Sequence, residues 1–344
     1  MKLRIFHGPI NICGIGRHLA DAERERGARS DFITFRVNPI ADESHRCLNL
    51  RQYGSVKKRL VLLGFFLQSL VKYDVFHFYY GVTLLPWGLD LPILRLFRKR
   101  IFMTYCGSDV RLASIEQERN PYWEKLCILA DDPSNDRAKL RLMRWHRLWI
   151  PHVVAPRSLY ATAQKVFPAH AIVKDVWNHN TIDLESYVPR YGGRGGRPVI
   201  VHAPSSRAIK GTEFVEKAIE ELRREGLEFR YLRIENRSHA DTLRLIRDDA
   251  DIVVDQMFAG DFGTLAVEGM ALGKPVVGHL LEVVKDEHYP DVPMVSATVE
   301  TLKDHLAELL RDPEERVRLG RAGRAFVEKH FDRRKVSDRI LELY

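Results

Sequence analysis

The residues best suited to chemistry lie in the stretch GDFGTLAVEGMALGKPVVGHL, residues 260–280. A loop containing Gly260 and Gly263 follows the apolar run of a predicted strand and precedes a predicted helix that begins at Thr264. The first-turn N–H groups of a helix lack partners within it, and the helix dipole adds partial positive charge, so this position suits an anion. The glycines carry no Cβ and let the backbone approach that anion closely.

Glu268 lies four residues beyond Thr264, on the same helical face and one turn deeper. A carboxylate in this position can accept two hydrogen bonds from a vicinal diol such as that of a ribose. Phosphates at the helix tip and a ribose one turn in would together place a nucleotide here. The alternative is that Glu268 only interacts favourably with the helix dipole, as acidic residues near helix starts do.

A second group, HAPSSRAIKGTEF at residues 202–214, also lies between a predicted strand and a predicted helix. Arg207 and Lys210 are three residues apart, with Ser206 before them and Gly211 after them. Two cations in such a loop can hold a diphosphate, and arginine can do so with two parallel hydrogen bonds. Solvated surface charges are the ordinary alternative, but the expected position on the same sheet edge as the first stretch favours the diphosphate.

Two further groups carry a weaker signal. Gly14 and Gly16 lie between the first predicted strand and helix, and a GxG spacing without a third glycine is a poor dinucleotide fingerprint. They form either a tight turn or one wall of a phosphate or acceptor pocket. Asp109 and Arg111, in the polar loop of TYCGSDVR, either face the cleft or belong to a turn in which Ser108 or Asp109 caps the residues that follow.

We expect no catalytic metal. The sequence DAD at residues 249–251 matches a metal-binding DxD pattern, but it stands at the start of a predicted strand, on the sheet edge away from the site. The 14 histidines include no HxxxH pair with an acidic partner.

Predicted strands and helices alternate along the whole chain, which indicates parallel sheets with helices on both faces. The predicted strands are residues 2–8, 30–37, 73–80, 100–107, 152–157, 197–203, 229–236, 250–258 and 274–280. The predicted helices are residues 15–27, 56–71, 90–100, 136–149, 212–226, 239–249, 264–273 and 299–312.

The expected fold class is α/β, with two doubly wound domains on either side of a cleft that is lined by loops after the carboxyl ends of the strands. The Gly-, Arg- and Pro-rich residues 189–198 predict an exposed connection between the domains, or a long surface loop within one of them.

Length and composition set wider limits. A chain of 344 residues that is 45% hydrophobic suggests two globular domains with sizeable cores. The formal net charge of +8 favours anionic partners, among them nucleotide phosphates, nucleic acid and acidic membrane surfaces. We expect no nucleic-acid partner, because no groove-reading motif occurs and the charge is dispersed. The four cysteines lack CxxC spacing and predict reduced thiols in a cytoplasmic protein.

Residues 56–71, VKKRLVLLGFFLQSLV, form the most apolar predicted helix and are shorter than the ~20 residues that span a bilayer. Apolar residues occupy nearly all of its circumference. The helix is either buried on two sides or dips into a membrane surface with its three consecutive cations at the headgroups. The residues predicted for one face are Val56, Leu60, Leu63, Leu67 and Leu70, and the cations are Lys57, Lys58 and Arg59.

The chain resembles the retaining glycosyltransferases of family 4, which have the GT-B fold of two Rossmann-like domains. The resemblance rests on DFGTLAV followed by EGMALGKPVV, on SSRAIKG, on CGSDVR, on WNHNTIDLESY at residues 177–187 and on LLRDPEERVRLGRAGRAFVEKHFD at residues 309–332. It implies an N-terminal acceptor-binding domain over residues 1–176 and a nucleotide-sugar-binding domain over residues 177–325. It also implies a C-terminal helix, residues 326–344, that crosses back to the first domain.

The resemblance implies transfer of a hexosyl unit from a UDP- or GDP-sugar to a hydroxyl acceptor, with retention of anomeric configuration and without a cofactor. A lipid-linked acceptor, a role in polysaccharide or glycoconjugate synthesis and peripheral contact with the inner face of the membrane through residues 56–71 are part of this expectation. Arg207 and Lys210 would stabilise the leaving diphosphate, and Gly260, Asp261, Phe262, Gly263, Thr264 and Glu268 would hold the donor, as would Gly14, Gly16, Ser206 and Gly211. Cys106, Asp109 and Arg111 would contact sugar or acceptor.

Three departures from the family pattern bear on the donor sugar. Gly260 stands where the family's signature usually has its first glutamate, Cys106 replaces the histidine of the HG loop, and the Arg-to-Lys spacing is shorter than the commonest form. A nucleotide-sugar epimerase or phosphorylase on the same fold, and a non-catalytic nucleotide-sugar-binding subunit, are the alternatives.

Overall fold

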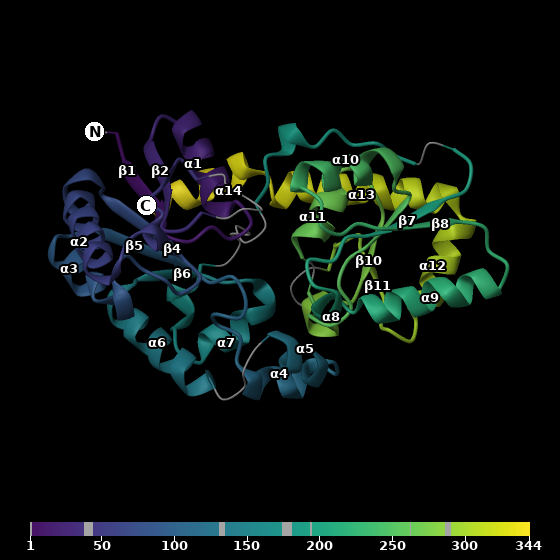
Figure 1. Cartoon of the computed structure of the whole chain (residues 1–344), viewed down its shortest axis with the longest axis horizontal. Coiled ribbons are helices and arrows are strands. Elements are labelled where there is room, and N and C mark those ends of the chain that lie inside the picture. Colours follow the sequence, from purple (N-terminus) through teal and green to yellow (C-terminus); the bar gives the residue numbers. More distant parts are fainter. Residues whose placement is uncertain are drawn as a thin grey trace. The chain divides into compact units, whose positions relative to one another are not determined.

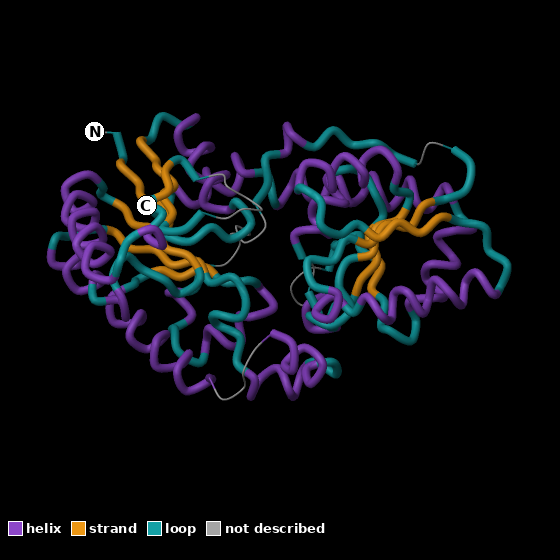
Figure 2. Tube along the Cα trace, in the orientation of Figure 1, coloured by secondary structure: helices purple, strands orange, loops and turns teal. Residues whose placement is uncertain are grey.

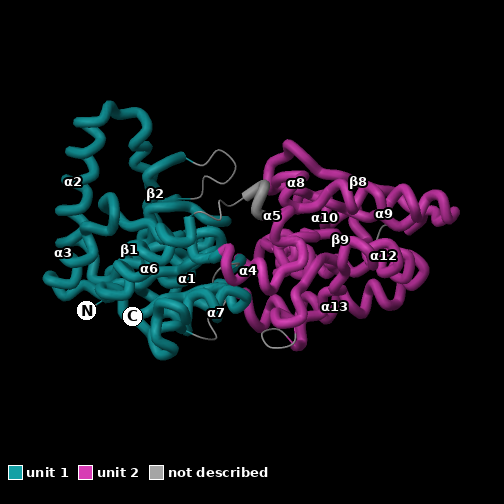
Figure 3. Tube along the Cα trace, turned by 90° about the horizontal axis from the view of Figure 1, so that it is seen from below, with its two compact units in different colours: residues 1–112, 134–182, 333–344 teal, residues 113–133, 183–332 magenta. Residues whose placement is uncertain are grey.

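The computed structural model describes residues 2–37, 44–130, 135–173, 181–192, 195–261, 263–285 and 290–344, with the side chains of residues 127–130 outside this description. The chain divides into two compact units (Figure 3). Unit 1 consists of Met1–Leu112, Ser134–Ile182 and Arg333–Tyr344, and unit 2 of Ala113–Pro133 and Asp183–Asp332. Each unit contains one parallel sheet with helices packed around it (Figure 2), which confirms the predicted α/β class.

The sheet of unit 1 has six strands in the order β3-β2-β1-β4-β5-β6, and every paired neighbour runs parallel. The strands are β1 (Arg4–Gly8), β2 (Arg29–Thr34), β3 (Arg46–Cys47), β4 (Val75–Tyr79), β5 (Arg100–Thr104) and β6 (His152–Val154). The helices of this unit are α1 (Ile15–Glu25), α2 (Ser55–Lys72), α3 (Asp90–Leu96), α6 (Asp136–Trp149), α7 (Tyr160–Gln164) and α14 (Arg333–Leu341). Short 3-10 turns are η1 (Leu50–Gln52), η2 (Pro86–Gly88), η4 (Arg157–Leu159) and η5 (Ala169–Ala171).

Alternating side chains of the central strands build two separate cores, because successive residues of a strand point to opposite sheet faces. Phe6 of β1 joins Phe76 and Phe78 of β4 in the core under α2 and α3, which lie on the same side of the sheet (Figure 1). Ile5 and Val75 join the opposite core, which α1 and α14 cover. Because both faces are buried, these strands are almost continuously apolar or aromatic, as the sequence predicted.

The sheet of unit 2 has five strands in the order β11-β10-β9-β7-β8, again all parallel. The strands are β7 (Val199–His202), β8 (Arg230–Arg233), β9 (Ile252–Val254), β10 (Val276–Gly278) and β11 (Val295–Ser296). The helices are α4 (Ala113–Arg119), α5 (Trp123–Ala130), α8 (Arg207–Lys210), α9 (Thr212–Arg224), α10 (His239–Asp249), α11 (Thr264–Ala271), α12 (Leu302–Arg311) and α13 (Pro313–His330), with the 3-10 turn η7 (Leu184–Ser186).

Two segments are part of a unit whose other residues lie far from them along the chain. Residues 113–133, which lie within the range predicted for the first domain, are part of unit 2. There the Asn120 side-chain amide donates to the carbonyl of Phe258 at 2.8 Å, and the Tyr122 hydroxyl donates to Glu300 at 2.9 Å.

The C-terminal segment packs into unit 1 through α14. Arg26 at the end of α1 pairs with Asp338 at 2.7 Å, and Arg333 pairs with Glu25 at 2.7 Å. The ring of Tyr344 is buried, and its hydroxyl hydrogen-bonds the ring of His77 on β4.

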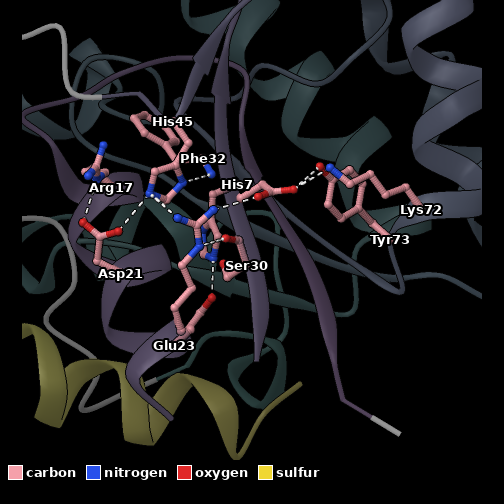
Figure 4. A network of polar contacts seen from close by, with 11 residues as sticks. His7, Arg17, Asp21, Glu23, Ser30, Phe32, His45, Lys72 and Tyr73 are labelled. Atoms are coloured by element: carbon pink, nitrogen blue, oxygen red, sulfur yellow. Dashed lines mark hydrogen bonds and ion pairs between the residues drawn. The ribbon is translucent and has the colours of Figure 1, made fainter. Parts of the chain in front are cut away.

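Polar side chains buried beside β1 join that strand to α1 (Figure 4). The His7 ring bonds Glu23 at 2.8 Å through Nε2 and the Tyr79 hydroxyl at 2.7 Å through Nδ1. At the edge of the same network the backbone N–H of Phe32 donates to His45 Nδ1 at 3.0 Å. Nδ1 therefore carries no hydrogen, and His45 binds Asp21 through a protonated Nε2 at 2.8 Å.

Helix α2 is not buried on two sides, so that interpretation of residues 56–71 was wrong. One face packs Phe65, Phe66 and Leu70 into the core. The opposite face exposes apolar side chains, the most exposed being Val71 at 77%. No described helix combines the length and the hydropathy that crossing a bilayer requires.

Candidate functional site

The loops that follow β7 and β9 meet at the centre of the unit 2 sheet. The chain runs from β7 to β8 on one side and then returns to place β9 on the other side of β7. Ligands of open parallel sheets bind at such a reversal, outside the carboxyl ends of the strands. Lys210, at the end of α8, and Gly263, before α11, both come from these two loops.

The ammonium group of Lys210 lies at the amino end of α11. Its Nζ donates to Asp255 Oδ1 at 3.3 Å and to Gln256 Oε1 at 3.0 Å, and only 15% of the side chain is exposed. The other oxygen of Asp255 accepts the backbone N–H of Gly263 at 2.7 Å. The fully buried Asp255 carboxylate therefore fixes a cation beside the start of a helix whose dipole is also positive there.

Gln256 shapes the loop that leads into α11. Its side-chain amide accepts from Lys210 and donates through Nε2 to the carbonyl of Asp261 at 2.5 Å. The backbone of Asp261 is thereby held, whereas Phe262 lies outside the described residues. Thr264 is the first residue of α11, as predicted from the sequence.

Glu268 is buried one turn into α11 and ties three elements together. Its Oε1 accepts from His239 Nε2 at 2.6 Å and from the Tyr187 hydroxyl at 3.2 Å. His239 is the first residue of α10 and Tyr187 follows η7. Among the described residues Oε2 accepts no hydrogen bond, so one carboxylate oxygen remains available to a ligand.

Arg207 lies at the start of α8, but its guanidinium points to acidic residues and not to Asp255. It pairs with Glu216 at 2.9 Å and with Glu235 at 3.8 Å, and 54% of its side chain is exposed. Arg233 pairs with both of these glutamates as well. The structure thus brings Lys210 to the helix tip and holds Arg207 in a neighbouring charge cluster.

Two glycines of the site have left-handed backbone conformations. Gly260 has φ 68°, and a Cβ there would lie 2.7 Å from Leu281 Cδ1. Gly211, which ends α8 and precedes α9, has φ 71°, and a Cβ there would lie 2.9 Å from Met257 Cβ. The backbone at Gly260 thus disfavours any side chain at this position, since the side chain would be strained and would meet Leu281. Ser206 is the residue before α8 and adopts an extended conformation.

His202 joins the two strands that bear the site. The Val254 carbonyl can only accept, so Nδ1 donates to it at 2.9 Å and Nε2 accepts from the Thr212 hydroxyl at 2.9 Å. Burial lowers the pKa of His202, which favours this neutral tautomer. The ring therefore fixes the spacing between β7, β9 and the start of α9.

The remaining predicted site residues lie in unit 1. Gly14 precedes α1 with its N–H bonded to Asn11, and Gly16 packs under the ring of Phe32, leaving no room for a side chain. Asp109 accepts the backbone N–H groups of Cys106 at 3.0 Å and Gly107 at 2.7 Å, so it caps this turn.

Burial raises the pKa of Asp109 to about 6, although the two backbone N–H groups oppose this rise. Burial likewise raises the pKa of the Cys106 thiol, which donates to the Thr104 carbonyl. Arg111 follows the same turn and is partly exposed.

Sequence reasoning missed four residues of the unit 2 site, namely Asp255, Gln256, His239 and Tyr187. Asp255 and Gln256 could have been predicted from the sequence, because they directly follow the apolar run IVV at the carboxyl end of a predicted strand. His239 could not have been predicted from the sequence, since only the strand order shows that the loop after β8 lies near α11. Asp251 of the DAD sequence caps the start of β7 by accepting the N–H of Val199 at 2.9 Å.

No protein-family model matches the chain, and a search of curated proteins finds no sequence relative. Solved structures do match it over its whole length. Sucrose-phosphate synthase from Thermosynechococcus elongatus aligns with 100% of this chain and 98% of its own, with a TM-score of 0.70 and 16% identity. HepE from Anabaena, solved in complex with UDP and glucose, aligns over 100% and 99%, with a TM-score of 0.68 and 15% identity. WaaG, a glycosyltransferase involved in lipopolysaccharide biosynthesis, aligns over 98% and 99%, with a TM-score of 0.58 and 14% identity.

The chain has the GT-B fold. Identities this low establish the fold alone, and an activity has to be argued from the site.

The conformation of Gly260 gives a first prediction. We expect Gly260→Ala to lower the free energy of unfolding by about 1–2 kcal/mol for the left-handed backbone and by about 1–3 kcal/mol for the clash with Leu281. Gly226→Ala is the matched control, because Gly226 has φ 82° with open space around it. Urea denaturation of both variants measures the difference, and equal losses would show that Leu281 does not constrain this position.

The raised pKa of Asp109 gives a second prediction. Between its ordinary pKa of 3.8 and about 6 the folded protein holds a proton that the unfolded chain releases. The stability contributed by protonated Asp109 is therefore complete below the lower value and is lost as the pH rises through about 6.

Asp109→Asn removes this titration while keeping an oxygen that can cap the turn. We expect the unfolding free energy of the natural protein, minus that of the variant, to fall as the pH rises from about 4 to about 7. Urea denaturation at several pH values measures it, since all other groups cancel in the difference. A difference that does not change with pH would contradict the assignment.

Proposed function

We propose that this protein is a glycosyltransferase that moves a hexosyl unit from a nucleoside diphosphate sugar, with UDP or GDP as the nucleotide, to a hydroxyl acceptor. The observation that carries the proposal is the position of the Lys210 ammonium beside Gly263 at the start of α11, where the unit 2 sheet reverses its strand order. The GT-B fold that it shares with HepE, solved with UDP and glucose, supports the same conclusion.

The diphosphate of the donor would bind between Lys210 and the first turn of α11. As the bond between the sugar and the diphosphate breaks, negative charge grows on the leaving oxygen. Lys210 and the first turn of α11 are held in place before the reaction by Asp255, which accepts from Lys210 and from the N–H of Gly263, and donors that are positioned in advance are the most effective. The proposed reaction requires no metal, because these groups supply the positive charge.

Arg207 would join the diphosphate by leaving its carboxylate partners. Its side chain is half exposed, so this exchange disturbs no packing. Glu216 and Glu235 would each keep one ion pair, because Arg233 pairs with both of them. A phosphate can accept two parallel hydrogen bonds from the guanidinium, as a carboxylate does.

Glu268 would hold the ribose, one turn deeper than the phosphates. His239 and Tyr187 occupy Oε1 and orient the carboxylate, while Oε2 is available for a ribose hydroxyl. Gly260, Asp261, Ser206 and Gly211 would form the walls of this donor site.

We propose that the transfer retains the anomeric configuration and uses no protein nucleophile. The C1–O bond to the diphosphate breaks and a C1–O bond to the acceptor oxygen forms on the same face of the sugar. The proton of the acceptor hydroxyl passes to an oxygen of the leaving diphosphate. The products are a glycoside and a nucleoside diphosphate.

Unit 1 would bind the acceptor, with Cys106, Asp109 and Arg111 as the candidate contacts. We propose that the enzyme is cytoplasmic and acts in polysaccharide or glycoconjugate synthesis. It would contact the membrane peripherally through residues 56–71.

The charge of Lys210 gives a third prediction. With a donor identified by thermal shift, Lys210→Ala should lower turnover by ~10²–10³, the usual loss when one preorganised donor is removed. Lys217→Ala on α9 is the control, since that side chain is 72% exposed and pairs with Glu221 of the same helix. Full activity of Lys210→Ala, with its fold intact by circular dichroism, would refute the proposed site.

The role of Glu268 gives a fourth prediction. Glu268→Gln should weaken binding of UDP or GDP by about 10-fold or more, because a charged acceptor for the ribose is lost. It should leave the binding of inorganic pyrophosphate unchanged, since pyrophosphate has no ribose. His239→Ala distinguishes a purely structural role: if it weakens nucleotide binding as much as Glu268→Gln does, Glu268 only anchors α10. Isothermal titration calorimetry measures both ligands.

A further inference from the structure

Basic and acidic residues are divided unevenly between the two units. Unit 1 contains 30 lysine and arginine residues against 13 aspartate and glutamate residues, whereas unit 2 contains 24 against 33. The formal net charge is therefore +17 for unit 1 and −9 for unit 2. The diphosphate site does not account for this excess, because that site lies in unit 2. A charge of this size raises the local concentration of anionic ligands, so the partner of unit 1 is expected to be an anion.

Two adjoining cavities lie at the carboxyl ends of three strands of unit 1, and we call them the unit 1 cavities. Their volumes are about 350 Å³ and about 600 Å³. The larger one is lined by the residues that directly follow β1, β2 and β4, which are Pro9, Phe35 and Tyr80. The unit 1 sheet reverses its strand order between β1 and β4, and ligands of open parallel sheets bind at such a reversal.

Two arginines line both of the unit 1 cavities. Arg36 follows β2, Arg51 lies in η1, and Lys58 adds a third cation to the smaller cavity. Within the described part of the chain neither arginine forms an ion pair, and the described lining residues include no aspartate or glutamate. Each guanidinium is therefore available to a carboxylate or a phosphate, which it can bind with two parallel hydrogen bonds.

The other walls of the unit 1 cavities are apolar and partly aromatic. Phe35 and Val82 line both cavities, and Trp87, whose side chain is largely exposed, lines the smaller one. A sugar ring presents C–H groups on its two faces and hydroxyl groups around its edge. Aromatic and apolar walls suit the faces of such a ring, while the arginines suit a charged substituent at its edge.

One hydrogen bond connects the larger cavity to the candidate acceptor contacts of the proposed function. Tyr80, in the wall of the cavity, hydrogen-bonds the Ser108 hydroxyl through its own hydroxyl. Ser108 belongs to the turn that Asp109 caps after β5, which is the strand beside β4. A ligand in the larger cavity would therefore lie beside the residues that are proposed to contact the acceptor.

We propose that the unit 1 cavities bind an anionic saccharide, a sugar with a carboxylate or a phosphate substituent, and that this saccharide is the acceptor. This inference rests on the proposed function and names its acceptor class. Arg36 and Arg51 would hold the charged substituent, and a hydroxyl of the sugar would receive the hexosyl unit. Cavities of this volume suit a ligand of a few rings, whereas a nucleic-acid duplex or a bilayer would meet the protein over a broad surface.

Isothermal titration calorimetry of the full chain with matched saccharides tests the charge requirement. One pair of probes is trigalacturonic acid and its methyl ester, which differ in their carboxylate charges, and the other is glucose 6-phosphate and glucose. We expect at least one acidic probe to bind about 10-fold or more tightly than its neutral partner at low salt. The preferred pair identifies the charged substituent as a carboxylate or a phosphate. Equal affinities within both pairs, or no binding by any probe, would overturn the proposal.

Variants of the two arginines test the assigned site. Arg36→Gln, Arg51→Gln should weaken binding of the preferred acidic probe by about 100-fold and leave the binding of UDP or GDP unchanged. Arg95→Gln, Arg98→Gln is the matched control, because it removes the same charge from exposed positions of unit 1 outside the cavities. The control should have a much smaller effect. Equal losses in the two variants would mean that only the net charge of unit 1 matters, and the assigned site would be wrong.

Competition separates the saccharide from other polyanions. Trp87 fluorescence follows occupancy of the smaller cavity, with Trp87→Phe as the blank. The acidic probe should saturate a change in this signal, and neither a DNA duplex nor phosphatidylglycerol vesicles should displace it at physiological salt. Displacement by either one would show that the cavities select for charge alone, which would contradict a saccharide site.

Nucleotide binding distinguishes this inference from the proposed function. If UDP or GDP binds through Lys210 and no acidic saccharide binds, the acceptor class is wrong and the transferase stands. If an acidic saccharide binds at Arg36 and Arg51 and no nucleoside diphosphate binds, the proposed function fails, and the role of the saccharide as acceptor fails with it.

Discussion

The buried carboxylate of Asp255 is the interaction on which the unit 2 site depends. It accepts the ammonium of Lys210 with one oxygen and the N–H of Gly263 with the other. Taking this carboxylate out of water costs free energy that only such partners offset. Because the two partners come from different loops, satisfying Asp255 forces the loop after β7 and the loop after β9 into one fixed arrangement.

The groups around Asp255 extend that arrangement outward. Gln256 joins Lys210 to the backbone of Asp261, and His202 ties β7 to β9 through the carbonyl of Val254. Glu268 connects α11 to the start of α10 and to Tyr187. The start of α11 and the ammonium beside it are therefore held by partners from neighbouring loops, and the proposed stabilisation of a leaving group depends on such fixed positions.

The two units offer different chemistry to a ligand. The site of unit 2 is built from charged and amide groups and suits a water-soluble diphosphate. The cavities of unit 1 are walled by apolar side chains with three cations around them.

The sequence by itself determined the central strands, most of the helices between them and part of the site. It did not predict the short edge strands β3 and β11 or the helices α4 and α5. The spacing of apolar residues gave the alternating strands and helices, and Thr264, Glu268 and Lys210 could be placed at strand exits because these positions depend only on local order along the chain. The tertiary structure decided the rest. Strand order brings His239 to Glu268 and turns Arg207 toward Glu216, and neighbours from other elements leave one apolar face of α2 uncovered while they bury the other. Partners and exposure arise from contacts between distant segments, which local spacing does not encode.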